Sequence, residues 1–443
     1  MKKIFFYILF HYIYYNNLIN CSIILPLYSN FSKIDEKNLS LEKLKENNFE
    51  NIFKIGIYSN ISIGEPEQII PTLISLQNSN LNFYIINQSL NGTYIKENSQ
   101  TFKFFENPPN KVNCYGDNYF LTILSEENFK FKDLKLNERN YNLSFNLVIN
   151  SNKKKLDYKS YIGLAPYEKK ENINKISFLT QLKKKRYIFS NIFTLRFDKL
   201  KNKGEIIIGN YPHEYEPKKY KIDNLKVIGK EFFNEWIINF NYFAFKKNYD
   251  KNNKDLLFEI DKKINFKINI GINYIFLPKK LSKIIDKIIE LIYQNNCTKY
   301  DLEYSKYTYI CNNNIDIKKF PTLILSLKIQ KINFELDYSD LFYKKNDTYF
   351  LLLKLHNGDL RYGEIGLPFL SKYQLVFHEM DLFVGYYLDN LNKEYSIIII
   401  TLSISIFINI LFIIFYLRRY YKRKMIKIID YSYKNDTYIE KLI

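Results

Sequence analysis

The chain has 443 residues, of which 47% are hydrophobic and 17% aromatic, and its formal net charge is +19. This length exceeds what a single hydrophobic core usually organises, so it predicts more than one structural unit. The lysines are spread over short runs and no nucleic-acid-binding motif accompanies them, so we expect solvated surfaces and no nucleic-acid partner. The four histidines and four cysteines lack the paired spacing of zinc ligands, and no Gly-rich phosphate loop is present. We therefore expect neither a metal nor a cofactor.

The N-terminus predicts a secretory signal peptide over residues 1–22. Lys2 and Lys3 precede an apolar stretch, Ile4 to Tyr15, that is too short to span a bilayer. Cleavage is expected between Asn20 and Ser22. Residues 23–50 follow as a polar lead, because asparagine, lysine and glutamate dominate this stretch.

From residue 51 onward, short β-branched and aromatic runs alternate with turn residues, which predicts a mostly β structure. One helix is expected from Pro278 to Tyr293, because a proline start precedes apolar residues spaced three and four apart. No internal repeat is visible in the residues themselves.

Several short motifs follow one another along these runs. Those of the first half are 55–57, 63–68, 115–117, 161–165 and 204–209, which contain most of its glycines. Those of the second half are 236–238 and 365–377. Two further segments, 73–84 and 269–278, each join an apolar run to a short polar turn.

The C-terminal part predicts a transmembrane helix over residues 396–417. These 22 residues are uncharged, which is enough for a helix to cross a hydrocarbon core of ~30 Å. Arg418 and Arg419 follow at once, with more basic residues at 422–424, so the positive-inside rule places the tail, residues 418–443, in the cytosol. Together with the signal peptide, this predicts a single-pass type I membrane protein of the secretory pathway or cell surface.

In order and spacing, the motifs between about residues 50 and 388 resemble those of the pepsin-like aspartic proteases, among them the plasmepsin-type enzymes. The resemblance implies a bilobal, mostly β fold with an N-terminal lobe over 51–215 and a C-terminal lobe over 216–388. It also offers a vestigial pro-segment as the alternative to a polar lead over 23–50. Further implied features are a flap tyrosine at Tyr115, support of the active-site loops by Gly163, Gly271 and Gly366, and a disulfide between Cys297 and Cys311.

The same resemblance places Ser75 and Asn269 where the family has its two catalytic aspartates. In such enzymes one carboxylate acts as the base toward water while the other, protonated, polarises the substrate carbonyl. A serine without a base and an amide that accepts no proton near neutral pH cannot take these roles. We expect the two side chains to face each other at the floor of a cleft, within hydrogen-bonding reach, as a degenerate dyad.

An oxidising compartment bears on the remaining features. Cys114 is left without a partner within the chain, and we expect a buried, inert thiol; the alternatives are a reactive thiol beside the cleft and a disulfide with another protein. Glycosylation is permitted at Asn-x-Ser/Thr sequons, which occur at Asn30, Asn38, Asn60, Asn87, Asn91, Asn142, Asn296 and Asn346.

Three functions remain open from the sequence. The first is a membrane-anchored pseudoprotease that binds a polypeptide ligand or protein partner through its lobes. The second is an active aspartic-type endopeptidase with an unusual dyad, which fold alone would suggest. The third is a surface or adhesion protein that uses the lobes as a display scaffold.

Overall fold

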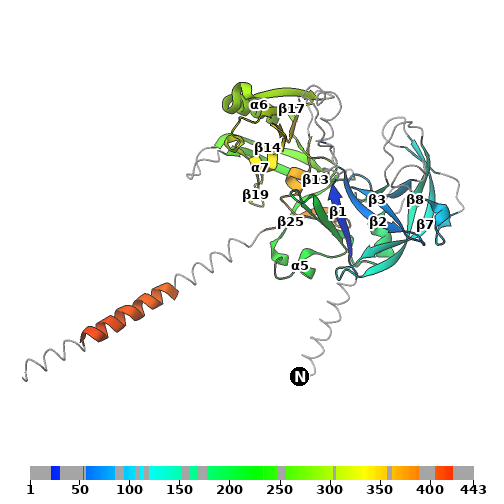
Figure 1. Cartoon of the computed structure of the whole chain (residues 1–443), viewed down its shortest axis with the longest axis horizontal. Coiled ribbons are helices and arrows are strands. Elements are labelled where there is room, and N and C mark those ends of the chain that lie inside the picture. Colours follow the sequence, from blue (N-terminus) through cyan, green and yellow to red (C-terminus); the bar gives the residue numbers. More distant parts are fainter. Residues whose placement is uncertain are drawn as a thin grey trace, which may run out of the picture. The chain divides into compact units, whose positions relative to one another are not determined.

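The computed structural model describes residues 21–29, 53, 56–84, 94–105, 110–113, 119–151, 160–166, 177–232, 234–246, 256–302, 306–356, 362–388 and 405–422. The chain divides into two compact units, Met1–Tyr387 and Leu388–Ile443, and both expected lobes lie in the first (Figure 1). Strands make up most of the described part of this first unit, as the sequence predicts.

A closed ring of six strands organises the first half of the chain. In ring order these are β2 (Ile57–Ile63), β3 (Gln68–Ser75), β9 (Tyr161–Gly163), β4 (Leu81–Tyr84), β8 (Glu138–Ser151) and β7 (Tyr119–Lys132), which returns to β2. The pairs β3–β9 and β4–β8 are parallel, and the others are antiparallel. Alternate residues turn inward, so that the rings of Phe83, Phe129 and Phe145 meet at 5.5 to 5.9 Å between centroids.

Short elements complete this half. They are the 3₁₀ helix Lys96–Asn98, β5 (Lys103–Phe104), β6 (Asn110–Asn113) and α4 (Phe178–Lys184). The hydroxyl of Ser177 accepts the backbone N–H of Thr180 and thereby caps the start of α4.

The second half repeats the same path of strands. Its order is β13 (Glu235–Lys246), β14 (Leu256–Ile268), β23 (Tyr362–Ile365), β15 (Ile275–Phe276), β22 (Leu353–His356) and β17 (Lys306–Asn312). The pairs β14–β23 and β15–β22 are parallel, in the places that β3–β9 and β4–β8 hold in the first half. The molecule therefore contains a structural repeat that the residues themselves do not reveal.

The expected helix after Pro278 is present as α6 (Lys279–Tyr293). Its apolar residues at three- and four-residue spacing, among them Leu281, Ile285 and Ile288, are buried. The other elements of this half are β16 (Cys297–Leu302), β18 (Thr322–Leu327), β19 (Ile332–Leu336), α7 (Tyr338–Leu341), β20 (Phe342–Lys345), β21 (Thr348–Leu351), α8 (Leu367–Leu370) and 3₁₀ helices at Gln294–Asn296 and Ile317–Lys319.

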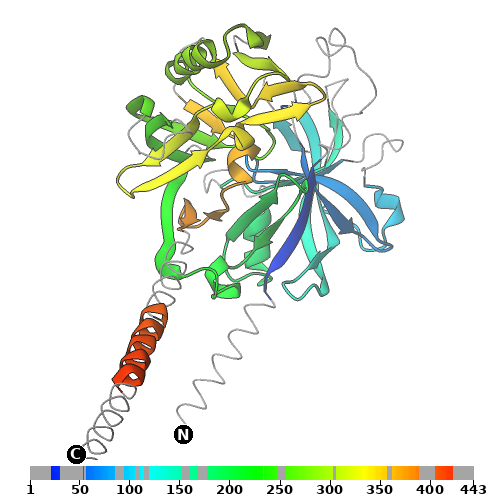
Figure 2. The same cartoon turned by 60° about the vertical axis from the view of Figure 1, so that its left-hand side comes forward.

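An antiparallel sheet of six strands joins the two halves. In order these are β1 (Ile23–Ser29), β11 (Lys203–Ile208), β10 (Ile192–Asp198), β24 (Leu375–His378), β25 (Phe383–Tyr387) and β12 (Leu225–Phe232). Figure 2 shows the dark blue β1 beside green strands of the first half. Between the halves along the chain lie α5 (Pro212–Tyr215) and the 3₁₀ helix Ile222–Asn224.

Strand β1 departs from the expectation of a polar lead over 23–50. Of residues 23–50, the structure describes only the first seven, Ile23–Ser29, and these form strand β1. In this strand Ile23, Leu25 and Leu27 are buried. These residues alternate inward and outward as a half-buried strand does. The expected polar character therefore does not hold for this part of the segment.

A single tryptophan connects the halves through its side chain. The indole N–H of Trp236 donates to the carbonyl oxygen of Leu164 at 2.9 Å, and Trp236 is 1% exposed. Its ring meets Phe377 edge-on, and Phe377 in turn stacks on Phe193 with 4.5 Å between ring centroids. Residues from both halves thus share one aromatic cluster, in which Phe193 and Phe377 belong to strands of the joining sheet.

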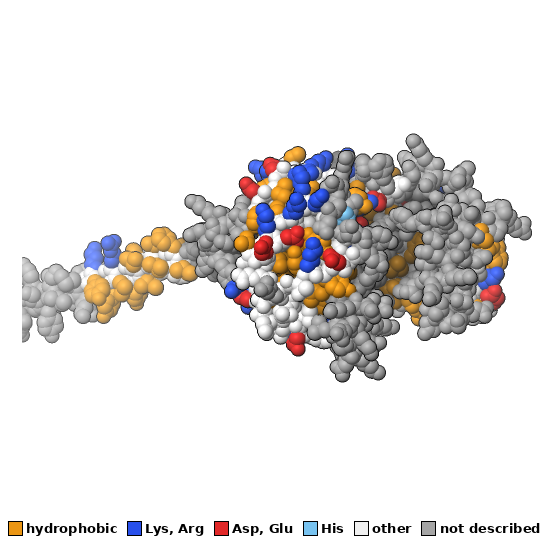
Figure 3. Space-filling view, turned by 90° about the horizontal axis from the view of Figure 1, so that it is seen from above, with side chains coloured by type: hydrophobic (Ala, Val, Ile, Leu, Met, Phe, Trp, Pro, Cys, Tyr) orange, Lys and Arg blue, Asp and Glu red, His pale blue; other side chains and the backbone are white. Residues whose placement is uncertain are grey.

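The second unit contains one described helix, residues 405–422. Its side chains are exposed, and Figure 3 shows hydrophobic side chains over most of its length with basic ones at one end. No helix within the described residues is long and apolar enough to cross a membrane. Residues 396–404 of the expected transmembrane segment and 423–443 of the tail lie outside the described residues, as do residues 1–20 of the signal peptide.

The expected disulfide is confirmed. Cys297 and Cys311 are bonded and face each other at the open end of the β16–β17 hairpin. Cys311 is fully buried, and the two residues are 14 apart in sequence. Cys114 lies outside the described residues.

The disulfide yields a stability prediction. Replacing both cysteines, Cys297→Ser with Cys311→Ser, should lower the free energy of unfolding by about 3 kcal/mol, because a closed loop of this length restricts the unfolded chain. Denaturant unfolding of the variant and of the wild type under non-reducing conditions measures the difference. Equal midpoints for the two proteins would show that this bond does not contribute to stability.

Candidate functional site

Ser75 ends strand β3, at the point where the chain turns into a short loop. The backbone pairs Ser75 with Gly163 of β9, and the Ser75 carbonyl oxygen accepts the N–H of Leu164 at 2.7 Å. The Ser75 hydroxyl oxygen accepts the backbone N–H of Gln77 at 3.2 Å and the side-chain amide of Asn78 at 3.3 Å. The serine side chain is therefore engaged by its own loop.

Asn269 stands at the corresponding place in the second half. It follows directly on Ile268, the last residue of β14, which pairs with Ile365 of β23. The Asn269 N–H donates to the Ile365 carbonyl oxygen at 2.9 Å, and its side-chain oxygen accepts the N–H of Gly271 at 3.0 Å. As in the first half, a side-chain oxygen accepts the N–H two residues further on. In this loop Gly271 supplies that N–H.

Two glycines lie directly against these loops. A Cβ atom on Gly163 would lie 2.3 Å from the carbonyl oxygen of Asn78, three residues after Ser75. A Cβ atom on Gly366 would lie 2.3 Å from the carbonyl oxygen of Ile272, three residues after Asn269. Only glycine allows such close backbone approach. Gly163 and Gly366 therefore lie against equivalent loops of the two halves.

These contacts make Ser75 and Asn269 equivalent positions of the structural repeat. Among the described residues, no hydrogen bond joins the two side chains, although the sequence leads us to expect them within bonding reach, and no carboxylate bonds to either one. The next residues, Leu76 and Ile270, are apolar and buried, at 2% and 1% exposed. Tyr115, the expected flap residue, lies outside the described residues.

Comparisons with known proteins agree with this geometry. A sequence model of the family described as eukaryotic aspartyl protease matches residues 58–386. The crystal structure of basic 7S globulin from soybean matches with a TM-score of 0.58 at 14% identity, covering 83% of this chain and 94% of that one. At this identity the likeness shows the fold alone, and it confirms the mostly β, pepsin-like fold. No curated protein sequence matches the chain.

A buried carboxyl group that the sequence did not single out is Glu379, just after β24. Its two oxygens accept from the hydroxyl of Ser177 at 2.9 Å and from the side-chain amide of Asn191 at 2.7 Å. Its backbone N–H donates to the Asn191 carbonyl oxygen at 2.9 Å. Glu379 therefore ties the C-terminal hairpin to the cap of α4 and to the residue before β10.

Burial raises the pKa of Glu379 to about 7, and the bonds from Ser177 and Asn191 offset this only in part. The neighbouring His378 is also buried, and burial lowers its pKa. A carboxyl group whose pKa is higher in the folded state binds its proton more tightly there. Its contribution to stability is present below the ordinary pKa of glutamate and is lost as the pH rises through about 7.

Replacing Glu379 with glutamine should remove this pH dependence. The free energy of unfolding of the wild type should fall by about 3 kcal/mol more than that of Glu379→Gln between mildly acidic and mildly alkaline pH. The glutamine can keep both hydrogen bonds. Its oxygen accepts from Ser177, and its NH₂ group donates to the side-chain oxygen of Asn191 once the Asn191 amide is rotated by half a turn. That oxygen is buried and has no hydrogen-bond partner in the described structure. Denaturant titrations at several pH values measure the difference.

The control for this comparison is Glu97→Gln. The Glu97 carboxylate is 62% exposed, so this change should leave the free energy of unfolding with the same dependence on pH as in the wild type. A Glu379→Gln profile parallel to that of the wild type would contradict the assignment.

Proposed function

This chain belongs to the eukaryotic aspartyl protease family, and we propose that it is a member that binds a polypeptide or protein partner through its lobes without cleaving it. The observation that carries the proposal is the pair of residues at the ends of β3 and β14. Ser75 and Asn269 hold equivalent positions, and neither has a carboxylate partner among the described residues.

Peptide hydrolysis in this family requires a proton acceptor for the attacking water and a proton donor for the carbonyl oxygen. The serine hydroxyl has no base beside it in the described structure, and its oxygen already accepts two hydrogen bonds. An asparagine amide accepts no proton near neutral pH. Because the two catalytic groups act as a unit, their loss costs on the order of 10⁶ in rate.

The preserved framework supports a binding role. The loops that carry Ser75 and Asn269 keep the same hydrogen bonds to N–H groups two residues on, and both keep a glycine behind them. A partner bound between such loops would meet a preorganised surface, which lowers the entropy cost of binding.

The proposal predicts that the purified full chain releases no fragments from a peptide library between acid and neutral pH. A transition-state mimic with a central hydroxyl should bind poorly, because that hydroxyl is recognised between two carboxylates. Mass spectrometry of the library detects cleavage, and calorimetry measures the mimic. Turnover that disappears in Ser75→Ala or Asn269→Ala would establish instead an active endopeptidase with an unusual dyad.

The complementary variant restores both carboxylates, as Ser75→Asp with Asn269→Asp. We expect at most weak cleavage from it, because Leu76 and Ile270 place buried apolar side chains where the family has hydroxyl residues that orient the pair.

We further propose that the protein is anchored in a membrane of the secretory pathway or at the cell surface, with its lobes on the lumenal or extracellular side. The support lies in the uncharged segment 396–417 and the basic residues that follow it. In the described helix, Ile406, Phe412 and Phe415 expose 60% or more of their surfaces, and exposed apolar surface of this extent commonly marks a site of association.

Protease treatment of intact vesicles that contain the full chain should remove only residues after Leu417 and protect the lobes. Immunoblotting with antibodies against each end follows the two regions, and detergent-permeabilised vesicles serve as the control. Protection of the tail with loss of the lobes would reverse the proposed orientation.

A further inference from the structure

A cavity of about 580 Å³, here called the sheet-end cavity, lies at one end of the joining sheet. Its volume is within the range of ~300–1,000 Å³ that is usual for small-molecule sites. It is lined by residues 196–198 of β10, by 201 and 203–205 at the start of β11, and by 370–372 and 374 between α8 and β24. Among the described residues, this lining includes neither the loop after Ser75 nor the loop after Asn269, so the cavity is separate from the candidate site.

The lining is polar because one face of the sheet supplies much of it. Side chains of residues two apart in a strand lie on the same face, and so do those of directly paired residues. Arg196 pairs with Glu205. Asp198 pairs with Lys203, two residues along each strand, so these four side chains share one face. The register between β10 and β24, continued by one residue, places Gln374 opposite Arg196 on this face.

Most of the positive charges in the lining are paired with carboxylates. Arg196 donates through Nη1 to two glutamates, at 3.2 and 2.8 Å. Lys201 and Lys372 each pair with an aspartate, at 3.2 and 2.6 Å. Lys203 is exposed and is the one cation of the lining that has no ion pair within the described residues. It is therefore available to an anion that enters the cavity.

Two N–H donors in the wall of the cavity lack an acceptor. Nε of Arg196 and Nε2 of Gln374 are buried, and neither has a hydrogen-bond partner in the described structure. The other end of the Gln374 amide is engaged, because its oxygen accepts the hydroxyl of Tyr220 at 2.7 Å. A buried donor without an acceptor costs free energy, and buried polar groups are almost always partnered. Two such donors on facing strands therefore indicate an acceptor that a bound molecule supplies.

The chemistry of that molecule follows from the groups in the lining. Two N–H donors and an unpaired ammonium group match the oxygens of an anionic group. Asp198 and Glu205, on the same face, repel a bare anion but accept hydrogen bonds from hydroxyl groups. The lining thus suits a molecule that combines one oxyanion group with several hydroxyl groups, and its volume suits a molecule larger than an inorganic anion.

We propose that the sheet-end cavity binds a small anionic saccharide. Its phosphate, sulfate or carboxylate group accepts hydrogen bonds from Arg196, Gln374 and Lys203, while its hydroxyl groups donate to Asp198 or Glu205. The bound oxyanion gives the two buried donors the acceptor that the chain does not provide. This inference goes beyond the proposed function and does not rest on it, because the loops of Ser75 and Asn269 take no part.

The test is calorimetric titration of the full chain, in detergent micelles, with four probes: glucose 6-phosphate, glucose 6-sulfate, glucuronate and glucose. We expect at least one of the three anions to bind at least about tenfold more tightly than glucose, because hydrogen bonds to a charged group have this effect. The anion that binds most tightly identifies the anionic group. Affinity for glucose that equals or exceeds that for the anions, or no binding of any probe, would overturn the proposal.

The first variant, Gln374→Glu, places a carboxylate of the chain where the anionic group of the ligand is proposed to lie. One oxygen can still accept from Tyr220, and the other can accept from Nε of Arg196 on the facing strand. This variant should unfold at a temperature no lower than that of the wild type, yet bind the anion at least about tenfold more weakly. A folded variant that keeps the wild-type affinity would contradict the assignment.

The second variant, Lys203→Gln, changes an exposed side chain and so keeps the proposal testable should Gln374→Glu fail to fold. Loss of this charge should weaken anion binding about fivefold. The matched control is Lys230→Gln, which removes an exposed lysine of β12 outside the lining and should keep the wild-type affinity. Equal losses in the two variants would reflect net charge alone and would refute the site. Neither result bears on whether the chain cleaves peptides.

Discussion

Two close backbone contacts determine where the candidate site lies. Gly163 rests on the loop after Ser75, and Gly366 rests on the loop after Asn269, in each case against a carbonyl oxygen that a Cβ atom would strike. The strand ends are thereby fixed by backbone packing rather than by the side chains at the site. What each loop requires of that side chain is an oxygen that accepts the N–H two residues on. Serine and asparagine meet this requirement, so the framework can persist without carboxylates.

It follows that stability and chemistry are separable in this fold. The halves are held together by the six-stranded sheet, by the bond from Trp236 to Leu164, and by the buried Glu379. None of these contacts uses the side chain of Ser75 or Asn269. A proton acceptor at those positions matters only for hydrolysis, where a pair of carboxyl groups must share a proton. Replacing the pair would therefore remove the reaction without disturbing the contacts that hold the two halves together.

Features that depend on a local sequence pattern could be predicted from the sequence. A proline followed by helical periodicity predicted α6, whereas the loop supports Gly163 and Gly366 followed only from the resemblance to the pepsin-like proteases. Other features depend on contacts between distant residues. Glu379 is buried and accepts a hydrogen bond from Ser177, which lies 202 residues earlier in the chain. The residues next to Glu379 in the sequence include polar ones and gave no sign of this burial. Strand β1 was missed because its apolar residues were averaged with the polar ones that follow. The structural repeat is one of strand order, which the residues themselves do not carry.

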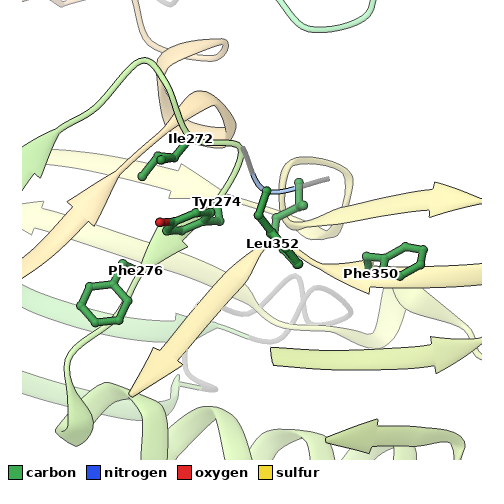
Figure 4. Packing of buried hydrophobic residues seen from close by; sticks show 6 residues of the cluster. Ile272, Tyr274, Phe276, Phe350 and Leu352 are labelled. Carbon is green, nitrogen blue, oxygen red and sulfur yellow. The ribbon is translucent and has the colours of Figure 1, made fainter. Parts of the chain in front are cut away.

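Phe53 adds a further contact between the halves. It precedes β2 of the first half, yet its side chain is buried among the second-half residues labelled in Figure 4, and its carbonyl oxygen accepts the N–H of Asn273 at 3.0 Å. Neither the joining sheet nor the Trp236 bond involves Phe53. The two halves are therefore held together by several contacts that are independent of one another, and none of them uses the side chain of Ser75 or Asn269. A change at either of these two positions can alter the chemistry of the site while the arrangement of the halves stays the same.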